Sequence, residues 1–311
     1  MEFFSHQTSF HFMATRKLWY ALSTVLVLVS LVSFFTRGLN LAIDFTGGVN
    51  AEVNFTHAVD VDAVRTQLTA AGFHEPEVQS FGSSRDIVVR LPPDAKLAAG
   101  EARSRLESAL RNVDAGAQVV QLDVVGPQVG NELKQSAINA LLATLVGIFI
   151  YIFWRFHTWR LSLGAIVAVL HDPILVIGFF AITQTPFDLA VVAAILAVIG
   201  YSLNDTVVVF DRIRERFETN RRSAPATVLD ESINQTLSRT IMTKVVTSIV
   251  VVALLWLGGP VLKGFSEALL IGIIAGTYSS IYISSAIALD CGLTAEHIFP
   301  SVKKELLDQR P

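Results

Sequence analysis

The sequence predicts an α-helical polytopic membrane protein with six transmembrane helices and one inserted α+β domain. Of its 311 residues, 52% are hydrophobic and 16% are charged, and the mean hydropathy is +0.52. Soluble domains carry charges on roughly a quarter of their residues. Six apolar runs are close to or above the length of about 20 residues that crosses a bilayer as a helix. Between the first two runs, residues 37–135 have the mixed composition of a soluble domain.

The first apolar run covers residues 18–36 and follows Arg16 and Lys17. A secretory signal peptide has a shorter apolar core and a cleavage site after small residues. We therefore expect a retained transmembrane helix behind an N-terminal segment, residues 1–17. The later spans are predicted at 136–154, 161–182, 188–210, 238–258 and 266–289, with a cytoplasmic loop at 211–237 and a tail at 291–311.

Basic residues concentrate in alternate connections, which predicts the orientation. One side of a six-helix topology receives Arg16, Lys17, Arg155, Arg160, Arg212, Arg214, Arg216, Arg221, Arg222, Lys303 and Lys304. The short loops on the other side, 183–187 and 259–265, contain only Lys263. Because cytoplasmic loops are enriched in Lys and Arg, we expect both termini in the cytoplasm of a bacterium and residues 37–135 in the periplasm.

The inserted segment has the pattern of a small α+β sandwich. Strand-like stretches lie at 51–55, 78–81, 87–91 and 117–125, and helical spacing lies at 61–71 and 98–110. This order, βαββαβ, is the split βαβ arrangement, so we expect a ferredoxin-like domain. Its sequence has no cluster of Cys and His and no nucleophile beside a base. We therefore predict no catalytic residue and no metal site in it.

Ionisable residues inside predicted spans are costly and usually functional, and the first two candidates are Asp205 and Arg239. Asp205 is 17 residues from Asp188, and Arg239 is 19 residues from Gly258, the outer ends of their helices. At 1.5 Å per residue both lie about 25–29 Å below the outer surface. An Asp205–Arg239 pair is therefore plausible. Arg stays protonated whereas Asp can titrate, so Asp205 is the candidate proton carrier. The alternatives are a static ion pair or two side chains reaching the cytoplasmic edge.

Further polar residues are candidate accessories. Asn204 and Thr206 flank Asp205, and His171 and Asp172 precede a proline in the middle of the third span. Proline removes a backbone hydrogen bond and kinks a helix, so the His-Asp pair either satisfies freed backbone or lines a wet path. Lys244 is either a relay member or a lysine that extends toward the interface.

Glycine-containing motifs predict turns and close packing. Asp44, Gly47 and Gly48 lead into the outer domain, and Gly126, Pro127 and Gly130 lead out of it. Both motifs are typical of turns or hinges. In the sixth span, small residues recur at every fourth position, which lets helix backbones approach closely: Gly272, Gly276, Ser280 and Ser284.

The sequence also narrows the class of function. It has no G-x-x-x-x-G-K-[ST] loop, the nucleotide-binding signature, so we expect a transport subunit rather than an enzyme with an ATP site. The net charge of −3 argues against nucleic acid as a partner, and the single cysteine, Cys291, excludes an internal disulfide.

Four motifs together resemble the SecD/SecF family of bacterial protein-export subunits. They are DFTGG at 44–48, VGPQVGNEL at 125–133, YSLNDTVVVFDRIRE at 201–215 and NQTLSRT at 234–240. The resemblance extends from about residue 14 to 300, and the motif at 201–215 is the most specific. Residues 1–12 have no counterpart.

The resemblance implies a coupling ion, partners and residue roles that the spacing of residues in the sequence does not indicate. The family belongs to the resistance-nodulation-division superfamily, whose members are driven by protons, so protons would be the coupling ion without another cofactor. It implies SecD as a second six-helix half, the SecYEG channel, a translocating preprotein and membrane lipid as partners, with YajC and YidC as further candidates. The roles in proton transport would fall to Asp205 and Arg239. Competing hypotheses are an exporter of small molecules or lipids and a scaffold whose polar pairs are inert.

Overall fold

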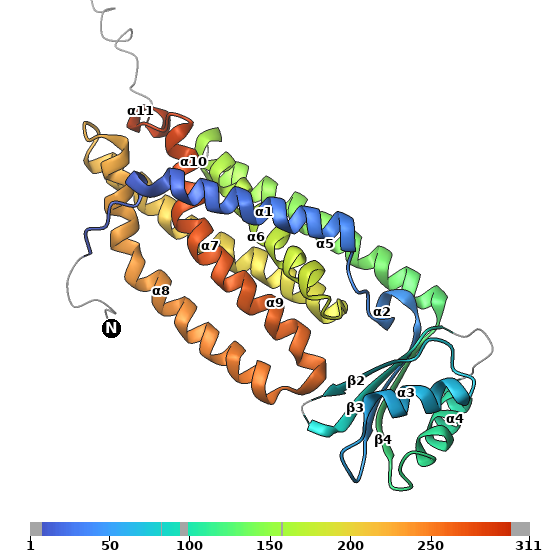
Figure 1. Ribbon diagram of the computed structural model, residues 1–311. Coiled ribbons are helices and arrows are strands. Elements are labelled where there is room, and N and C mark those ends of the chain that lie inside the picture. Colours follow the sequence, from blue (N-terminus) through green and yellow to red (C-terminus); the bar gives the residue numbers. More distant parts are fainter. Residues whose placement is uncertain (1–7, 82, 94–98, 157, 300–311) are drawn as a thin grey trace, which may run out of the picture.

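The computed structural model describes residues 8–81, 83–93, 99–156 and 158–299. Within them, six helices are long and apolar enough to cross a membrane, as predicted. The first five spans are α1 (Arg16–Arg37), α5 (Pro127–Phe156), α6 (Trp159–Thr183), α7 (Leu189–Thr219) and α8 (Pro225–Leu257). The sixth consists of α9 (Gly259–Tyr278), a π-helical turn η2 (Ser279–Ile283) and α10 (Ser284–Asp290). Figure 1 shows the sheet domain at one end of the bundle and the short helix α11 (Ala295–Ile298) at the other.

Two predicted boundaries are wrong. The segment 211–237, predicted as a loop, is helical except for residues 220–224. The two helices extend past the apolar zone because they pack on each other there, with Phe217 and Ile233 buried and Arg216 paired with Glu231. In the same way residues 127–135, assigned to the outer domain, form the first turns of α5.

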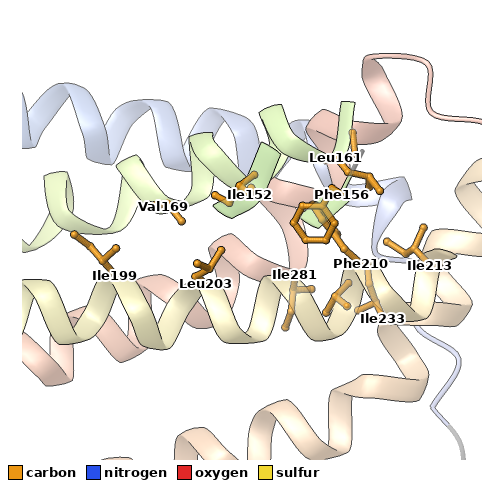
Figure 2. Close-up of a cluster of buried hydrophobic side chains, with 14 of the residues drawn as sticks. Ile152, Phe156, Leu161, Val169, Ile199, Leu203, Phe210, Ile213, Ile233 and Ile281 are labelled. Atoms are coloured by element: carbon orange, nitrogen blue, oxygen red, sulfur yellow. The ribbon is translucent and has the colours of Figure 1, made fainter. Parts of the chain in front are cut away.

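The helices divide into a central and a peripheral group. In the most apolar stretch of 18 residues of each span, 56% of the residues are buried in α6, 50% in α7 and 61% in the sixth span. The corresponding values are 11% in α1, 6% in α5 and 17% in α8. The central core includes Phe156 and Phe210, whose rings pack edge to face at 5.2 Å (Figure 2). The peripheral helices therefore expose their apolar side chains, as helices in contact with lipid or a partner do.

The outer domain has the predicted order of elements. They are β1 (Gly48–Asn54), α3 (Val61–Ala70), β2 (Glu77–Phe81), β3 (Ser83–Leu91), α4 (Ala99–Arg111) and β4 (Gln118–Val125). The strands form one antiparallel sheet in the order β2-β3-β1-β4. Alternate residues of β1, such as Val49, Ala51 and Val53, are buried in a core shared with α3 and α4, because successive side chains of a strand point to opposite faces.

The opposite face of the sheet is polar and turns toward the bundle. Asn50, Glu52 and Arg90 line a cleft there together with Asp188 and Lys263 from the outer ends of the membrane helices. Burial lowers the pKa of Arg90, an effect that the carboxylates of Glu77 and Asp188 oppose. Charged groups of the domain and of the bundle therefore face each other across this cleft.

Candidate functional site

A buried ion pair joins α7 to α8. Lys244 Nζ lies 2.7 Å from Asp205 Oδ2, and the residues are 4% and 5% exposed. Neither of these two atoms has a further hydrogen-bond partner among the described residues. Because a buried charge is costly unless it is compensated, each group depends on the other.

Tyr201 supports the lysine from the same helix as the aspartate. It precedes Asp205 by four residues, so both side chains lie on one face of α7. Lys244 Nζ is 4.2 Å from the centre of the Tyr201 ring, a distance typical of a cation–π contact. The Tyr201 hydroxyl donates to the Thr243 carbonyl at 2.9 Å and lies 2.9 Å from Thr247 Oγ1. The tyrosine thus fixes α8 beside α7 at this level.

The predicted Asp205–Arg239 pair is wrong as a direct contact. Arg239 lies five residues before Lys244, is exposed, and reaches Asp205 only through longer-range charge. The depth estimate places Asp205 and Arg239 at similar levels, but it could not tell which residue of α8 turns toward the aspartate. Lys244 rather than Arg239 points at the aspartate. Arg239 instead lies on the surface of the chain, available to a partner.

The two residues that flank Asp205 in the sequence differ in exposure. Asn204 is exposed, whereas Thr206 is fully buried. The Thr206 hydroxyl donates to the Ser202 carbonyl at 3.3 Å, within its own helix. Of these two, only Thr206 belongs to the interior.

A second buried polar cluster surrounds Asp172 on α6. Asp172 Oδ1 is 2.9 Å from His171 Nδ1, and Asp172 Oδ2 accepts a bond from Ser202 and one of 3.0 Å from Ser279. The Tyr278 hydroxyl lies 2.7 Å from His171 Nε2. The cluster therefore links α6, α7, α9 and the π-helical turn. These bonds all run between side chains, so His171 and Asp172 do not serve the carbonyl that Pro173 leaves unbonded.

The small residues of the sixth span make room for this cluster. A Cβ on Gly276 would lie 3.2 Å from Asp172 Oδ2 and from Ser202, and one on Gly272 would lie 2.2 Å from Val198. The Ser280 hydroxyl donates to carbonyls of its own helix, the nearer at 2.7 Å from Gly276. The glycines of this predicted row of small residues therefore face α7 and α6.

The two glycine motifs meet at the base of the outer domain. Gly47 and Gly48 have φ values of +75° and +125°, and a Cβ on Gly48 would lie 2.3 Å from the Leu91 carbonyl. On the way out, a Cβ on Gly130 would lie 2.9 Å from Gly47 N, and Pro127 lies against Gly47. Gly126 has open space around it. The lead-in and lead-out segments therefore pack directly on each other.

Asp44 connects this base to α7. It belongs to the short helix α2 (Ile43–Thr46), and its Oδ2 accepts a bond of 2.9 Å from Leu189 N, the first residue of α7. Asp188 caps the same helix end through Val191 N at 2.8 Å. Carboxylates are favourable at helix N-termini, where backbone N–H groups are unsatisfied. Burial raises the pKa of Asp188, and the charge of Asp44 acts in the same direction.

Sequence reasoning missed several participants. Tyr201 and Ser202 lie in the quoted motif at 201–215 but were given no role, although their spacing from Asp205 places them near its face. Ser279 and Tyr278 enter only through the tertiary fold. The N-terminal segment was also left without a role, yet Met13 N donates to Asp230 Oδ1 at 2.8 Å on α8. Within the described residues, no three His, Cys, Asp or Glu side chains gather as a metal site would require.

Comparisons with known proteins agree on one family. The model of "Protein export membrane protein SecD/SecF, C-terminal" matches residues 105–294, and that of the "SecD/SecF GG Motif" matches residues 32–59. The second match contains the motif of Asp44, Gly47 and Gly48. The first contains both buried polar sites.

Similar proteins cover almost the whole chain. The chain is 43% identical to the protein translocase subunit SecF of Pseudomonas aeruginosa over 97% of both chains. It is 45% identical to that of Haemophilus influenzae over 96% of this chain and 91% of the relative. Among solved structures, SecDF of Thermus thermophilus matches with a TM-score of 0.82 and 37% identity, over 91% of this chain but only 39% of SecDF. These matches show that the chain belongs to the SecD/SecF family of protein export membrane proteins.

Proposed function

We propose that the chain is the SecF-type subunit of a bacterial Sec protein translocase and that Asp205 couples proton passage to its movement. Relatives that carry the name SecF match 97% and 96% of this chain. The observation that carries the proton role is the Asp205–Lys244 pair, a buried ion pair within membrane-spanning helices in which neither bonding atom has another hydrogen-bond partner among the described residues.

Protonation of Asp205 would disrupt this pair. A neutral carboxylic acid no longer compensates the Lys244 ammonium, and breaking a buried pair by removing one charge costs about 3–5 kcal/mol. One proton crossing about 100 mV releases about 2.3 kcal/mol, to which a pH gradient adds. The two energies are of the same order. Lys244 therefore needs an alternative partner in the protonated state, and an acidic group of a second subunit would supply it once α7 and α8 have moved.

The outer domain would receive the movement through α7. This helix is continuous from Leu189 to Thr219, so Asp205 and the capped N-terminus belong to one element. Asp44 holds that N-terminus from the segment that leads directly into β1. A shift of α7 would thus be transmitted to the base of the outer domain without an intervening flexible loop.

The remaining assignments complete this proposal. The outer domain is a ferredoxin-like module, supported by its element order and the sheet order β2-β3-β1-β4. It faces the periplasm, and both termini of this inner-membrane chain are cytoplasmic. SecD is the partner half, since this chain matches only 39% of the fused SecDF structure. The SecYEG channel, YajC, YidC and the translocating preprotein are further partners, protons are the only coupling ion, and no ATP is used.

The test is Asp205→Asn in cells that contain the partner subunits. We expect loss of the uncoupler-sensitive part of preprotein release into the periplasm, with the complex still assembled. Asp211→Asn is the matched control, because Asp211 lies on the same helix and pairs with Arg155 near the helix end. This control should keep normal release. Uncoupler-sensitive release at the normal rate in Asp205→Asn would refute the proton role.

A further inference from the structure

The cluster around Asp172 is built as a chain of exchangeable hydrogens. In the state in which Asp172 is ionised, its carboxylate only accepts hydrogen bonds, so His171 donates to it through Nδ1 and Nε2 accepts from the Tyr278 hydroxyl. Adding one proton at His171 Nε2 requires only that the Tyr278 hydroxyl rotate and accept. The cluster can therefore take up a proton without separation of its helices.

Its position relates it to Asp205. Ser202, which donates to Asp172, lies on α7 three residues before Asp205. Three residues correspond to a rise of about 4.5 Å, and residues three apart lie on one helix face. Since the N-terminus of α7 is the end held by Asp44 at the outer domain, Ser202 is nearer the outer side than Asp205. The cluster thus stands between the outer surface and the ion pair.

The elements packed around the cluster carry few other ionisable groups at this level. Those in the middle of the bundle are Tyr201 and Asp205 on α7, Lys244 on α8, Tyr278 on α9 and Tyr282 on η2. The ionisable residues of α1, α5 and α10 lie near helix ends: Arg16, Lys17, Tyr20, Arg37, Glu132, Lys134, Tyr151, Arg155 and Asp290. On α9, Lys263 and Glu267 lie near the outer end. Asp172 is fully buried, and of the groups hydrogen-bonded to it or to His171, only Tyr278 is partly exposed.

We propose that His171 and Asp172 form a second proton-binding site, which passes protons between the outer side and Asp205 through the Ser202 hydroxyl. In this step Ser202 gives its hydrogen toward Asp205 as it accepts one from the cluster, so the hydroxyl is regenerated and one proton is moved. The geometry at η2 supports it, because π-helical turns occur frequently at functional sites and this one places Ser279 on Asp172. The inference rests on the proposed role of Asp205.

Transport provides the first test. With the partner subunits present, Asp172→Asn should lose the uncoupler-sensitive release of preprotein, and His171→Gln should reduce it about a hundredfold or more, a typical loss for a proton-transferring side chain. Ser279→Ala removes one donor to Asp172 and should slow release about tenfold, since a hydrogen bond to a charged group contributes about that factor. Ser280→Ala is the matched control, because its hydroxyl donates only within its own helix. Its release should equal that of the unchanged chain.

Infrared difference spectroscopy of the purified complex separates proton binding from a structural role. Titration with pH should change an absorbance of a carboxyl or imidazole that disappears in Asp172→Asn or His171→Gln and persists in Asp205→Asn. A complex in which the cluster shows no titrating signal, and in which Ser279→Ala releases preprotein as fast as Ser280→Ala, would overturn the second site. If Asp205→Asn itself transports normally, the proposed function fails instead, so the two failures are distinguishable.

Discussion

The two buried polar sites of this bundle contain the same kind of acid but surround it differently. Asp172 has both oxygens engaged, by His171, Ser202 and Ser279. Asp205 has Lys244 as an ion-pair partner, and within the described part of the chain its bonding oxygen has no further hydrogen-bond partner. A network in which the acid is fully hydrogen-bonded can redistribute a proton with little movement. An isolated ion pair, in contrast, must separate when its acid is neutralised. The difference suggests that one site passes protons and the other converts them into motion.

The largest effect on stability should follow from breaking the Asp205–Lys244 ion pair. Lys244→Met leaves the Asp205 charge buried without compensation and should reduce the free energy of unfolding in detergent by about 3–5 kcal/mol. Arg239→Met should change it by less than about 0.5 kcal/mol, because Arg239 is exposed in the isolated chain. Adding Asp205→Asn to Lys244→Met should restore most of the loss. Equal destabilisation by the two single changes would mean that Asp205 is held by Arg239 after all.

A smaller effect should come from crowding the bonded network. Gly276→Ala would place a methyl group 3.2 Å from Asp172 Oδ2 and Ser202, and overpacking of this kind costs about 1–3 kcal/mol. Chemical denaturation in detergent measures it. Gly200→Ala is the control in α7, where a Cβ meets nothing within 4 Å, and it should be neutral or stabilising by up to about 1 kcal/mol. A neutral Gly276→Ala would show that the network is loosely packed.

The next effect concerns helix α7, which connects the Asp205–Lys244 ion pair to the outer domain. Asp44→Ala removes a cap of α7 and should cost about 0.5–2 kcal/mol of stability while also lowering proton-driven release. Asp60→Ala removes the cap of α3, where Asp60 accepts from Asp62 N at 3.1 Å. It should cost a similar stability without a specific effect on release. If both variants release preprotein equally well, the cap does not transmit motion.

The smallest effect should be found at a carboxyl outside the bundle. Burial, followed by the charges of Asp123 and Asp86, raises the pKa of Glu52 on the polar sheet face. Its ionised form is therefore disfavoured in the folded state, so Glu52→Gln should slightly stabilise the outer domain at pH 7. The gain should vanish as the pH falls below about 4.3, the pKa of an unperturbed Glu. Thermal unfolding at both pH values measures this, and a gain that is independent of pH would exclude the charge as its cause.

Parts of the site could be predicted because they depend on local pattern. Asp205 and Asp172 were identified as ionisable groups inside apolar spans, and that identification needs no knowledge of packing. The order of strands and helices in the outer domain follows from alternation and helical spacing in the same way. The partner of Asp205 could not be predicted, because Arg239 and Lys244 lie in the same helix, five residues apart, and only the packing of α8 on α7 decides which of them reaches the aspartate.

The sequence by itself determined that the chain has six membrane helices and one inserted α+β domain, and that acids lie within α6 and α7, because transfer of apolar segments into lipid depends on composition and length. Only the tertiary structure decided that Lys244 reaches Asp205, that Ser279 in a π-helical turn reaches Asp172, and that Asp44 caps α7. These contacts join residues from 39 to 145 positions apart (244 − 205 and 189 − 44). They depend on helix rotation and side-chain packing, which no local pattern specifies.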